Sequence, residues 1–331
     1  MDYYDEFHHI FVPKKPWYPF LRKKTPLLTD IAMGIYYRAL SSKVDLNPAT
    51  DIALGVLCEV SNLVLVKIAE KTRVPYYLFY HDDNIFNRYW SHTALVKKQL
   101  NTILKKARHI FSVSEQMVEF LNGRNAHNTS VLYPIPDIYN GQPKQYNDDR
   151  SKSLNFCYAG LAMHIHFDII NRIGTAVKME GGKFYCVTGA VDGFNSQSPD
   201  TIIIKDRFKT VDALRQFMLE TIDVSVVFYS FDIQHEPRME SSFPSKFVEY
   251  AQLGIPVLLV APPYSSLGKW AVKNNWLSYV GTDESVEIAD MLAKLKEKEY
   301  WLACRQQVME KISSEFNPEE IHKAFLKEIT A

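Results

Sequence analysis

Short apolar runs alternate with amphipathic stretches along most of this chain, in the pattern that α/β proteins show. The first half predicts three helices, each followed by a strand, and then the start of a fourth helix. We expect these elements at residues 31–40, 51–57, 62–71, 75–80, 93–107 and 109–113, in that order. The fourth helix is expected to begin at Ser114, because serine caps helices and Glu115 and Gln116 follow it.

The second half repeats this alternation after a polar stretch. Strands are expected at 154–158, 184–187, 201–204, 224–229 and 257–260, and helices at 167–178, 211–219, 284–295, 300–312 and 318–329. The pattern predicts the α/β class, with two Rossmann-like doubly wound domains that face a cleft. The expected boundaries are 1–139 for an N-terminal domain, 140–153 for a linker, and 154–331 for a C-terminal domain that ends in closing helices.

Residues 241–260 combine a helix start, a helix and a buried strand. Pro244 is expected in the first helical turn, with Ser242 or Ser245 capping the free amides. The apolar residues that follow at helical spacing are Phe247, Tyr250, Ala251 and Leu253. Gly254 is expected to end the helix. A helix start beside the carboxyl end of a parallel strand is where α/β folds bind phosphates.

The composition is that of a globular protein, with 47% hydrophobic and 23% charged residues. The formal net charge is zero, so no global field favours nucleic acid as a partner. The charges are nevertheless uneven. Residues 1–150 contain 19 basic and 15 acidic side chains, whereas residues 151–331 contain 19 and 23. The first half is therefore expected to face something anionic.

The cysteines and the N-terminus indicate a cytoplasmic protein. Cys58, Cys157, Cys186 and Cys304 are scattered and form no metal-binding or redox spacing, which is typical of buried reduced thiols. The first residues are acidic and lack the apolar segment of a signal peptide. No run approaches the ~18 apolar residues of a membrane-spanning helix.

Two basic segments suggest a peripheral position on the inner face of the membrane. Residues 14–24 contain five positive charges, three aromatic residues and no acid, as an interfacial patch on anionic lipid would. Residues 97–108 are also strongly basic. The alternative is a loop held by its aromatic residues with solvated charges, because two prolines prevent a regular amphipathic helix at 14–24.

Lys246 and Glu249 are the charges on the first turns of the helix expected near residue 245. A cation there can hold a diphosphate together with free amides, and a carboxylate one turn later can accept both hydroxyls of a ribose. The alternative is a surface ion pair at i, i+3 spacing, which stabilises a helix by only tenths of a kcal/mol. Their position beside an apolar strand favours the nucleotide.

Residues 243–257 resemble the donor-binding segment of retaining nucleotide-sugar glycosyltransferases with the GT-B architecture, the glycosyl transferases group 1 family. The family pattern is roughly P-x-K-x-x-E-Y/A-x-A-x-G-x-P-V, and the sequence here is Phe-Pro-Ser-Lys-Phe-Val-Glu-Tyr-Ala-Gln-Leu-Gly-Ile-Pro-Val. Further similarities lie at 109–117, 132–137, 155–160 and 316–329. The resemblance covers about residues 50–330.

The resemblance implies a set of donor contacts. Lys246 would bind the donor diphosphate and Glu249 the ribose diol, and the loop after Gly160 would lie beside the phosphates. Arg207 and Phe208 fall on the loop that contacts the nucleotide base in the family. The donor would be a UDP- or GDP-linked sugar acting as substrate, with no cofactor and no metal, and the first domain would take the acceptor.

The candidate catalytic residues are His81, Asp82 and Glu240. His81 falls near where relatives present a histidine or an acid toward the reacting sugar. His81, Asp82 and Asp83 also form a set that can ligate Mg²⁺ or Mn²⁺, although the resemblance implies no metal. Glu240 lies in a polar segment directly before the donor segment, and the alternative is that this segment is a solvated loop.

Three departures from the family pattern are visible. Relatives have an acid eight positions before the second glutamate, whereas this chain has Ser241 there, with Glu240 adjacent. The loop after Gly160 contains His164 and His166 where relatives often have Arg and Lys. A protonated histidine can partly replace those cations, and an ordinary loop histidine is the alternative. Residues 1–30 contain no glycine-rich turn, so the first domain is expected to be reduced or rearranged.

These features predict a retaining, metal-independent glycosyltransferase that moves a sugar from a nucleotide-diphosphate sugar to a glycan or lipid-linked acceptor. The partners expected are the donor, the acceptor and, in one interpretation, an anionic membrane surface through 14–24 and 97–108, with no nucleic acid. One alternative is a non-catalytic glycosyltransferase-like subunit of a partner enzyme, which Ser241 motivates. A sugar-nucleotide epimerase of the same fold is the other.

Overall fold

The computed structural model describes residues 25–330, apart from residues 43, 57–62, 82–93, 125, 138, 140, 149–152 and 190–198. Its contacts divide the chain into two units. Met1–Phe111 and Leu121–Thr129 form the first unit, and Ser112–Phe120 and Ser130–Ala331 form the second. The predicted domain boundaries at 139 and 154 stay a prediction.

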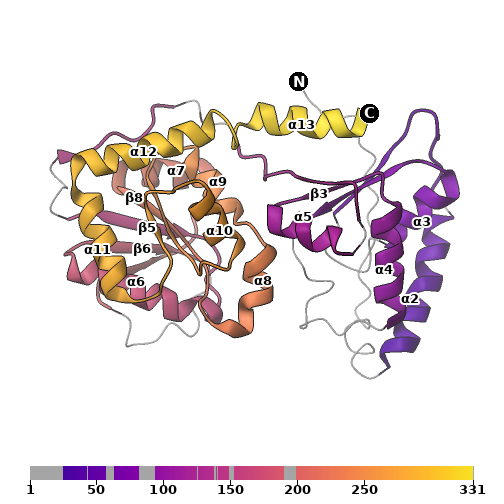
Figure 1. The fold of residues 1–331 in the computed structure, drawn as a ribbon, viewed down its shortest axis with the longest axis horizontal. Helices are drawn as coiled ribbons and strands as arrows, with labels where there is room; N and C mark the ends of the chain where they lie inside the picture. Colours follow the sequence, from indigo (N-terminus) through magenta and orange to yellow (C-terminus); the bar gives the residue numbers. More distant parts are fainter. Residues whose placement is uncertain are drawn as a thin grey trace. The chain divides into compact units, whose positions relative to one another are not determined.

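The first sheet has four strands in the order β1-β2-β3-β4. Its elements are α2 (Pro26–Ser41), β1 (Ala53–Val56), α3 (Leu63–Thr72), β2 (Tyr76–Tyr80), α4 (Ala94–Lys106), β3 (His109–Ser112), α5 (Glu115–Asn122) and β4 (Thr129–Val131). β1 and β2 are parallel, and α2 packs against α3 (Figure 1). Ser114 caps α5 as predicted, because its hydroxyl accepts a hydrogen bond from the Met117 amide at 3.0 Å.

The second sheet has six strands in the order β10-β9-β8-β5-β6-β7, and all of its pairs are parallel. Its strands are β5 (Asn155–Ala159), β6 (Lys183–Val187), β7 (Ile202–Lys205), β8 (Val224–Phe228), β9 (Val257–Val260) and β10 (Tyr279–Val280). Every residue of β8 and β9 is buried, as expected for strands covered on both faces.

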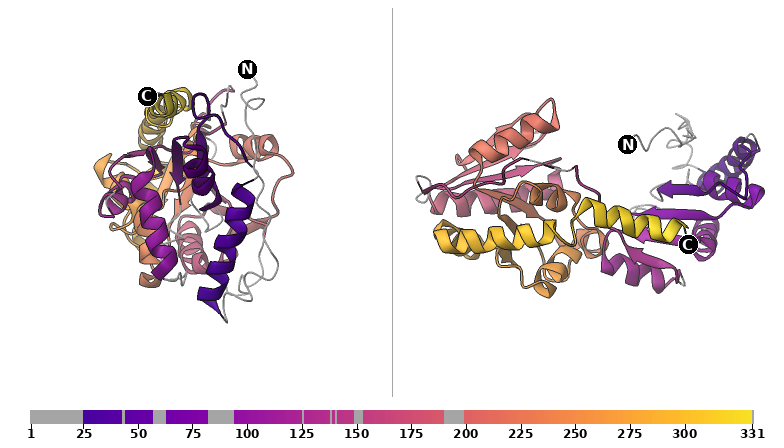
Figure 2. Two further views of the ribbon diagram at one scale, coloured as in Figure 1. Left: turned by 90° about the vertical axis from the view of Figure 1, so that its right-hand side faces the viewer. Right: turned by 90° about the horizontal axis from the view of Figure 1, so that it is seen from above.

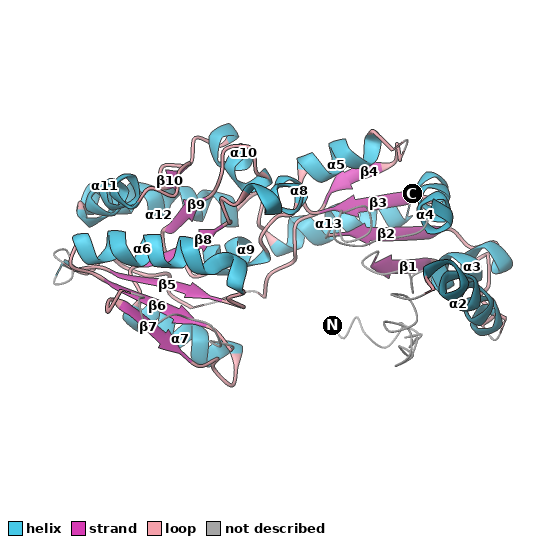
Figure 3. Ribbon diagram, turned by 90° about the horizontal axis from the view of Figure 1, so that it is seen from below, coloured by secondary structure: helices cyan, strands magenta, loops and turns pink. Residues whose placement is uncertain are grey.

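The helices of this unit lie between these strands in the sequence or follow the last of them (Figure 3). They are α6 (Phe167–Met179), α7 (Val211–Thr221), α8 (Glu236–Ser241), α9 (Ser245–Ala251), α10 (Ser266–Lys273), α11 (Ser285–Lys296), α12 (Lys298–Ile312) and α13 (Pro318–Thr330). α6 packs against α11, and α9 against α12. The last two helices follow one another at the carboxyl end of the chain, drawn in yellow in Figure 2. This alternation confirms the α/β class expected from the sequence.

The core of the second unit lies between this sheet and its helices. Phe156, Phe184 and Trp301 are among its fully buried large side chains. The indole of Trp301 also donates a hydrogen bond of 2.9 Å to the carbonyl of Asp223, so its one polar atom is satisfied. Tyr146, from the predicted linker, packs edge-on against Trp301 with ring centroids 5.4 Å apart.

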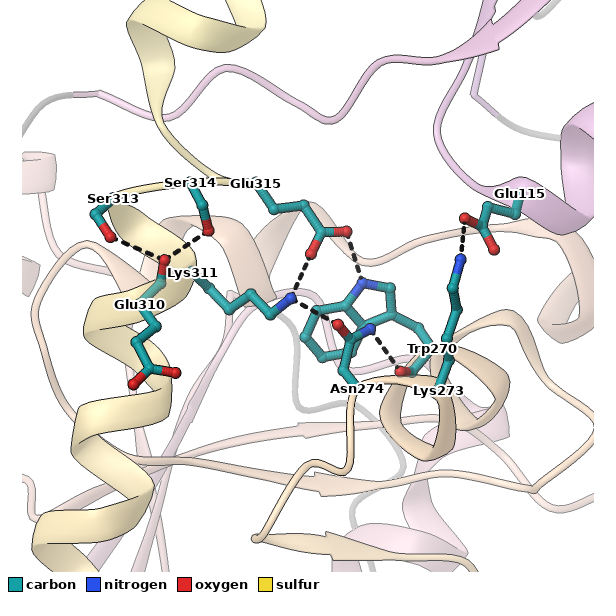
Figure 4. A network of polar contacts seen from close by, with 9 residues as sticks. All are labelled: Glu115, Trp270, Lys273, Asn274, Glu310, Lys311, Ser313, Ser314 and Glu315. Atoms are coloured by element: carbon teal, nitrogen blue, oxygen red, sulfur yellow. Dashed lines mark hydrogen bonds and ion pairs between the residues drawn. The ribbon is translucent and has the colours of Figure 1, made fainter.

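A polar network joins α10 to the turn between α12 and α13 (Figure 4). The Glu315 carboxylate accepts hydrogen bonds from the Trp270 indole at 3.0 Å and from Lys311 at 2.8 Å. Burial acts to raise the pKa of Glu315, but the hydrogen bonds from Lys311, Trp270 and Tyr133 outweigh it and hold that pKa below its ordinary value. Lys273 lies nearby and forms an ion pair of 2.5 Å with Glu115.

Several local predictions were wrong. The polar segment before Ser241 contains α8 rather than only a loop, and α10 and β10 were not predicted. α9 ends at Ala251, so Leu253 lies in the following turn, where its amide bonds the Tyr250 carbonyl. Gly254 does occupy the left-handed region, with φ at 60°, and this conformation favours glycine where the chain turns toward β9.

Candidate functional site

The strand order of the second sheet reverses between β5 and β8, which makes this place a topological switch point. From β5 the chain adds β6 and β7 on one side, and β8, β9 and β10 then extend the other side. β5 pairs with β6 as far as Ala159, but with β8 only at Phe156 and Cys157. The two central strands therefore lose their mutual hydrogen bonds before their carboxyl ends. In open α/β sheets, ligands bind outside the strand ends at such a switch point.

Gly160 and Lys246 come together at this place. Gly160 directly follows β5, and its amide donates to the Val187 carbonyl at 2.8 Å. The half-buried Lys246 side chain lies over the glycine, so closely that a Cβ at residue 160 would be 1.9 Å from Lys246 Cε and 2.9 Å from its Nζ. Among the described residues no carboxylate pairs with this ammonium group. The end of β5 therefore carries an available positive charge.

Glu249 lies one turn after Lys246 on α9 and is exposed. No ion pair joins the two side chains, and no cation of the described part of the chain neutralises Glu249. The surface ion pair that the i, i+3 spacing could have produced is therefore absent. An unpaired ammonium and an unpaired carboxylate on adjacent turns can accept a ligand that has both an anionic group and hydroxyls.

The serines beside α9 do not cap it, contrary to our prediction. Pro244 occupies the N-cap position and Ser245 is the first helical residue, and no side chain caps the helix. Ser242 makes its hydrogen bonds through its main chain instead. Its carbonyl accepts hydrogen bonds from the Tyr229 hydroxyl, at 2.7 Å, and from the Ser266 hydroxyl. The Ser242 hydroxyl is buried and, within the described residues, makes no hydrogen bond.

Ser241 and Glu240 differ sharply in environment. Ser241 is 5% exposed, and its carbonyl accepts a hydrogen bond of 2.5 Å from the Ser114 hydroxyl. Glu240 is exposed, with its carboxylate 4.0 Å from the Lys269 ammonium group. The position that holds an acid in the family pattern is thus a buried serine, and the adjacent acid lies in solvent.

The histidines after Gly160 lie in a short 3-10 turn, His164–His166. His164 is exposed. His166 is half-buried, its ring centroid lies 5.7 Å from that of Phe228 at the end of β8, and its Nδ1 accepts the Met163 amide at 3.3 Å. His164 is therefore the one of the two that solvent reaches freely.

Arg207 and Phe208 follow β7 at the same edge of the sheet. Arg207 is exposed, and its side chain packs against Gly189, where an added Cβ would lie 2.5 Å from Nε. Phe208 packs on Phe217 with ring centroids 5.2 Å apart, and the Lys205 ammonium group lies 5.2 Å from the Phe217 ring. This cluster presents a guanidinium group and an aromatic ring, which are suited to a planar base.

The first unit contributes one described candidate. His81 follows β2 and is exposed. Asp82 and Asp83, the remaining carboxylates of that motif, lie outside the described residues. Within the described part of the chain, no cluster of three or more His, Cys, Asp or Glu side chains has an arrangement suited to a metal ion. Among the described helices, none is long and apolar enough to cross a bilayer.

The hollow that residues 144–148 and Leu219 line, ≈ 570 Å³ in volume, lies in the predicted linker and includes none of the predicted site residues. Sequence reasoning also missed two contacts at the strand ends. It placed Tyr250 on the apolar side of its helix, but the Tyr250 hydroxyl bonds the main chain of Ala159. It gave no role to Gly189, which lies under Arg207.

Comparisons with known proteins identify the fold. No protein-family model and no curated protein sequence matches this chain. Among solved structures, sucrose-phosphate synthase from Thermosynechococcus elongatus matches with a TM-score of 0.64 and 13% identity, over 96% of this chain and 79% of that one. HepE from Anabaena, solved with UDP and glucose, matches with a TM-score of 0.59 and 14% identity, over 84% and 78%. The fold is that of the GT-B glycosyltransferases.

A third match is TarM from S. aureus, whose mutant was solved with fondaparinux, α-GlcNAc-glycerol and UDP. The TM-score is 0.61 at 15% identity, over 84% of this chain and 55% of that chain. This chain thus spans a little more than half the length of TarM. The predicted GT-B resemblance and Rossmann-like fold class are confirmed by these matches, while identities this low establish the fold alone.

Proposed function

We propose that this protein is a glycosyltransferase that binds a nucleotide-diphosphate sugar at the carboxyl ends of β5 and β8. One observation carries the proposal: the unpaired Lys246 ammonium group lies over Gly160 at the switch point of the second sheet. A ligand diphosphate at that position meets a cation held close to the strand end, because glycine has no Cβ and the lysine chain can pack against its main chain. The structures with UDP among the matches support this choice of ligand class.

The proposal gives the other donor residues the roles that the family resemblance implies. Glu249 accepts hydrogen bonds from the ribose diol, and Arg207 and Phe208 contact the base. Transfer breaks the bond between the anomeric carbon and the diphosphate oxygen and forms a bond to an acceptor oxygen, while the acceptor proton leaves with the diphosphate or a base. Lys246 stabilises the charge that develops on the departing diphosphate. His81 and Glu240 are the candidates for contacts with the reacting sugar.

A thermal-shift panel tests donor binding. UDP, GDP, ADP and CMP are added to the wild type, to Lys246→Ala and to Lys294→Ala, a control that removes an exposed lysine from α11. A ligand at 100 times its dissociation constant stabilises the folded state by about 2.7 kcal/mol. We expect stabilisation by UDP or GDP in the wild type and the control, and a much smaller shift in Lys246→Ala. No shift with any nucleotide in the wild type would contradict the proposal.

Transfer requires separate assays. With a UDP- or GDP-linked sugar and a mixture of glycan and lipid-linked acceptors, we expect a glycosylated product whose anomeric configuration matches that of the donor. We also propose that EDTA leaves the rate unchanged, because side chains neutralise the diphosphate. Inversion of configuration, measured by NMR of the product, would contradict a retaining mechanism. Loss of activity in EDTA would contradict independence from metals.

We also propose a cytoplasmic enzyme whose basic first half meets a lipid-linked acceptor at the membrane surface. Of the two basic segments, 14–24 lies outside the described residues, and the described part of 97–108 exposes Lys98 and Lys105 on α4. Sedimentation with vesicles that contain anionic lipid tests this point. Binding to anionic but not to neutral vesicles, weakened by salt, is the expected result.

A second function is favoured by the environment of Ser241. If the buried serine at the acid position removes an essential carboxylate, the chain would bind a nucleotide yet transfer nothing, as a non-catalytic subunit of a partner glycosyltransferase. This alternative predicts nucleotide-induced stabilisation without donor hydrolysis or transfer by the isolated chain. Transfer by the purified chain alone would exclude it.

A further inference from the structure

A tyrosine hydroxyl occupies the gap between the central strands of the second sheet. Tyr250 lies on α9, is 3% exposed, and contacts Ala159, the last residue of β5. The Ala159 amide donates to the Tyr250 hydroxyl oxygen at 2.9 Å, and the hydroxyl donates to the Ala159 carbonyl. One side-chain group thus satisfies both main-chain groups of a residue that is itself 6% exposed.

The sheet topology explains why this contact is needed. Successive residues of a strand direct their main-chain groups to opposite neighbours. The Gly160 amide bonds Val187 of β6, so the groups of Ala159 face the β8 side, where pairing has already ended at Cys157. Without Tyr250, a buried amide and a buried carbonyl would have no partner, which proteins avoid. The hydroxyl replaces the missing strand pairing at the switch point.

The same contact also connects the two residues of the proposed diphosphate site, Lys246 and Gly160. Lys246 lies four residues before Tyr250 on α9, hence on the same side of the helix, and Gly160 is the next residue after Ala159. The hydroxyl therefore joins the helix that carries the ammonium group to the strand end beneath it. Burial raises the pKa of Tyr250, so the hydroxyl keeps its proton and remains a donor.

We propose that Tyr250 is a positioning residue: its hydroxyl holds Gly160 and Lys246 in register for the donor diphosphate. This inference rests on the proposed function for its ligand, but the contact itself can be tested without one. The substitution Tyr250→Phe removes only the hydroxyl and retains the buried ring. Tyr300→Phe is the matched control, because it also removes a hydroxyl bonded to a carbonyl, that of Leu277 at 2.7 Å, from the same unit.

Two measurements are made on both variants and on the wild type. Hydrogen exchange followed by mass spectrometry reports on peptides that span residues 155–162, and calorimetry gives the dissociation constants of UDP and GDP well below the melting temperature. In Tyr250→Phe we expect faster exchange in 155–162 and a dissociation constant raised about tenfold. Tyr300→Phe is expected to match the wild type in both measurements, whatever its melting temperature.

The outcomes separate the two claims. Unchanged affinity in Tyr250→Phe, while the wild type binds a nucleotide, overturns the positioning role alone. Affinity lowered equally in both variants also overturns it, because the effect is then one of general stability. If neither UDP nor GDP binds the wild type, the proposed function fails and the positioning role fails with it. Unchanged hydrogen exchange in residues 155–162 would overturn the claim that the Tyr250 hydroxyl holds the end of β5, independently of any ligand.

Discussion

The contact between Gly160 and Lys246 permits a substitution that should weaken nucleotide binding while leaving the free energy of unfolding nearly unchanged. In Gly160→Ala, the new Cβ would lie 1.9 Å from Lys246 Cε. Carbon atoms pack at about 3.5 Å, so the lysine chain must move by about 1.6 Å. The atom it meets is near the end of a flexible side chain, and Gly160 does not have a positive φ. The backbone therefore tolerates alanine, whereas the ammonium group is displaced.

Gly160→Ala is expected to lose the binding free energy of one charge-assisted hydrogen bond between Lys246 and the diphosphate. Such a hydrogen bond contributes about 1.5–3 kcal/mol, which corresponds to a dissociation constant raised about 10- to 150-fold. The free energy of unfolding should change by less than about 1 kcal/mol, since the removed backbone freedom of glycine offsets small strain. Calorimetric titration with UDP or GDP and urea denaturation measure the two quantities.

Gly182→Ala is the matched control. There the added Cβ would lie 2.6 Å from the main-chain carbonyl oxygen of Leu154, which cannot move aside as a lysine chain can. This variant should lose stability and, where it remains folded, bind nucleotide as the wild type does. Wild-type affinity in Gly160→Ala would refute the assignment of Lys246 to the diphosphate.

Three further predictions concern other parts of the chain. Glu249→Ala should weaken binding of a nucleoside diphosphate by about tenfold and leave inorganic pyrophosphate unaffected in calorimetry; equal losses for both ligands would contradict a ribose contact. Glu315→Gln should lower the free energy of unfolding at pH 7, measured in urea. Because the pKa of Glu315 is depressed in the folded state, the carboxylate stabilises the fold above its ordinary pKa of 4.5, and the difference from wild type should shrink as the pH falls below that value; a difference that is the same at pH 7 and pH 3.5 would contradict this. Trp301→Ala should cost about 3–5 kcal/mol, whereas Leu302→Ala, exposed on the same helix, should cost less than about 1 kcal/mol in the same urea assay.

The periodic elements were predictable because burial alone determines their pattern. The all-apolar run of β9 indicated a strand covered on both faces, and the apolar faces of α6 and α11 follow the helical period. The helix α10 was missed because prolines precede it and Gly268 lies within it, which is typical of a loop. In the structure Ser265 caps it, accepting a hydrogen bond from the Gly268 amide at 3.0 Å.

The site was predictable only where its parts are close in sequence. Lys246 and Glu249 lie one turn apart on the same short helix, so their common position beside a strand could be expected. The bond from Tyr250 to Ala159 joins residues 91 positions apart. No local pattern distinguishes such a tyrosine from an ordinary core residue, and only the loss of strand pairing at β5 shows why its hydroxyl is required.

The role of Lys246 is tested most directly by comparing diphosphate with monophosphate. Calorimetry would give the dissociation constants of UDP and UMP, or GDP and GMP, for the wild type and Lys246→Ala. The wild type should bind the diphosphate at least about tenfold more tightly than the monophosphate, and this preference should disappear in Lys246→Ala. A preference that persists in the variant, or a wild type that binds neither nucleotide, would contradict a donor site at Lys246.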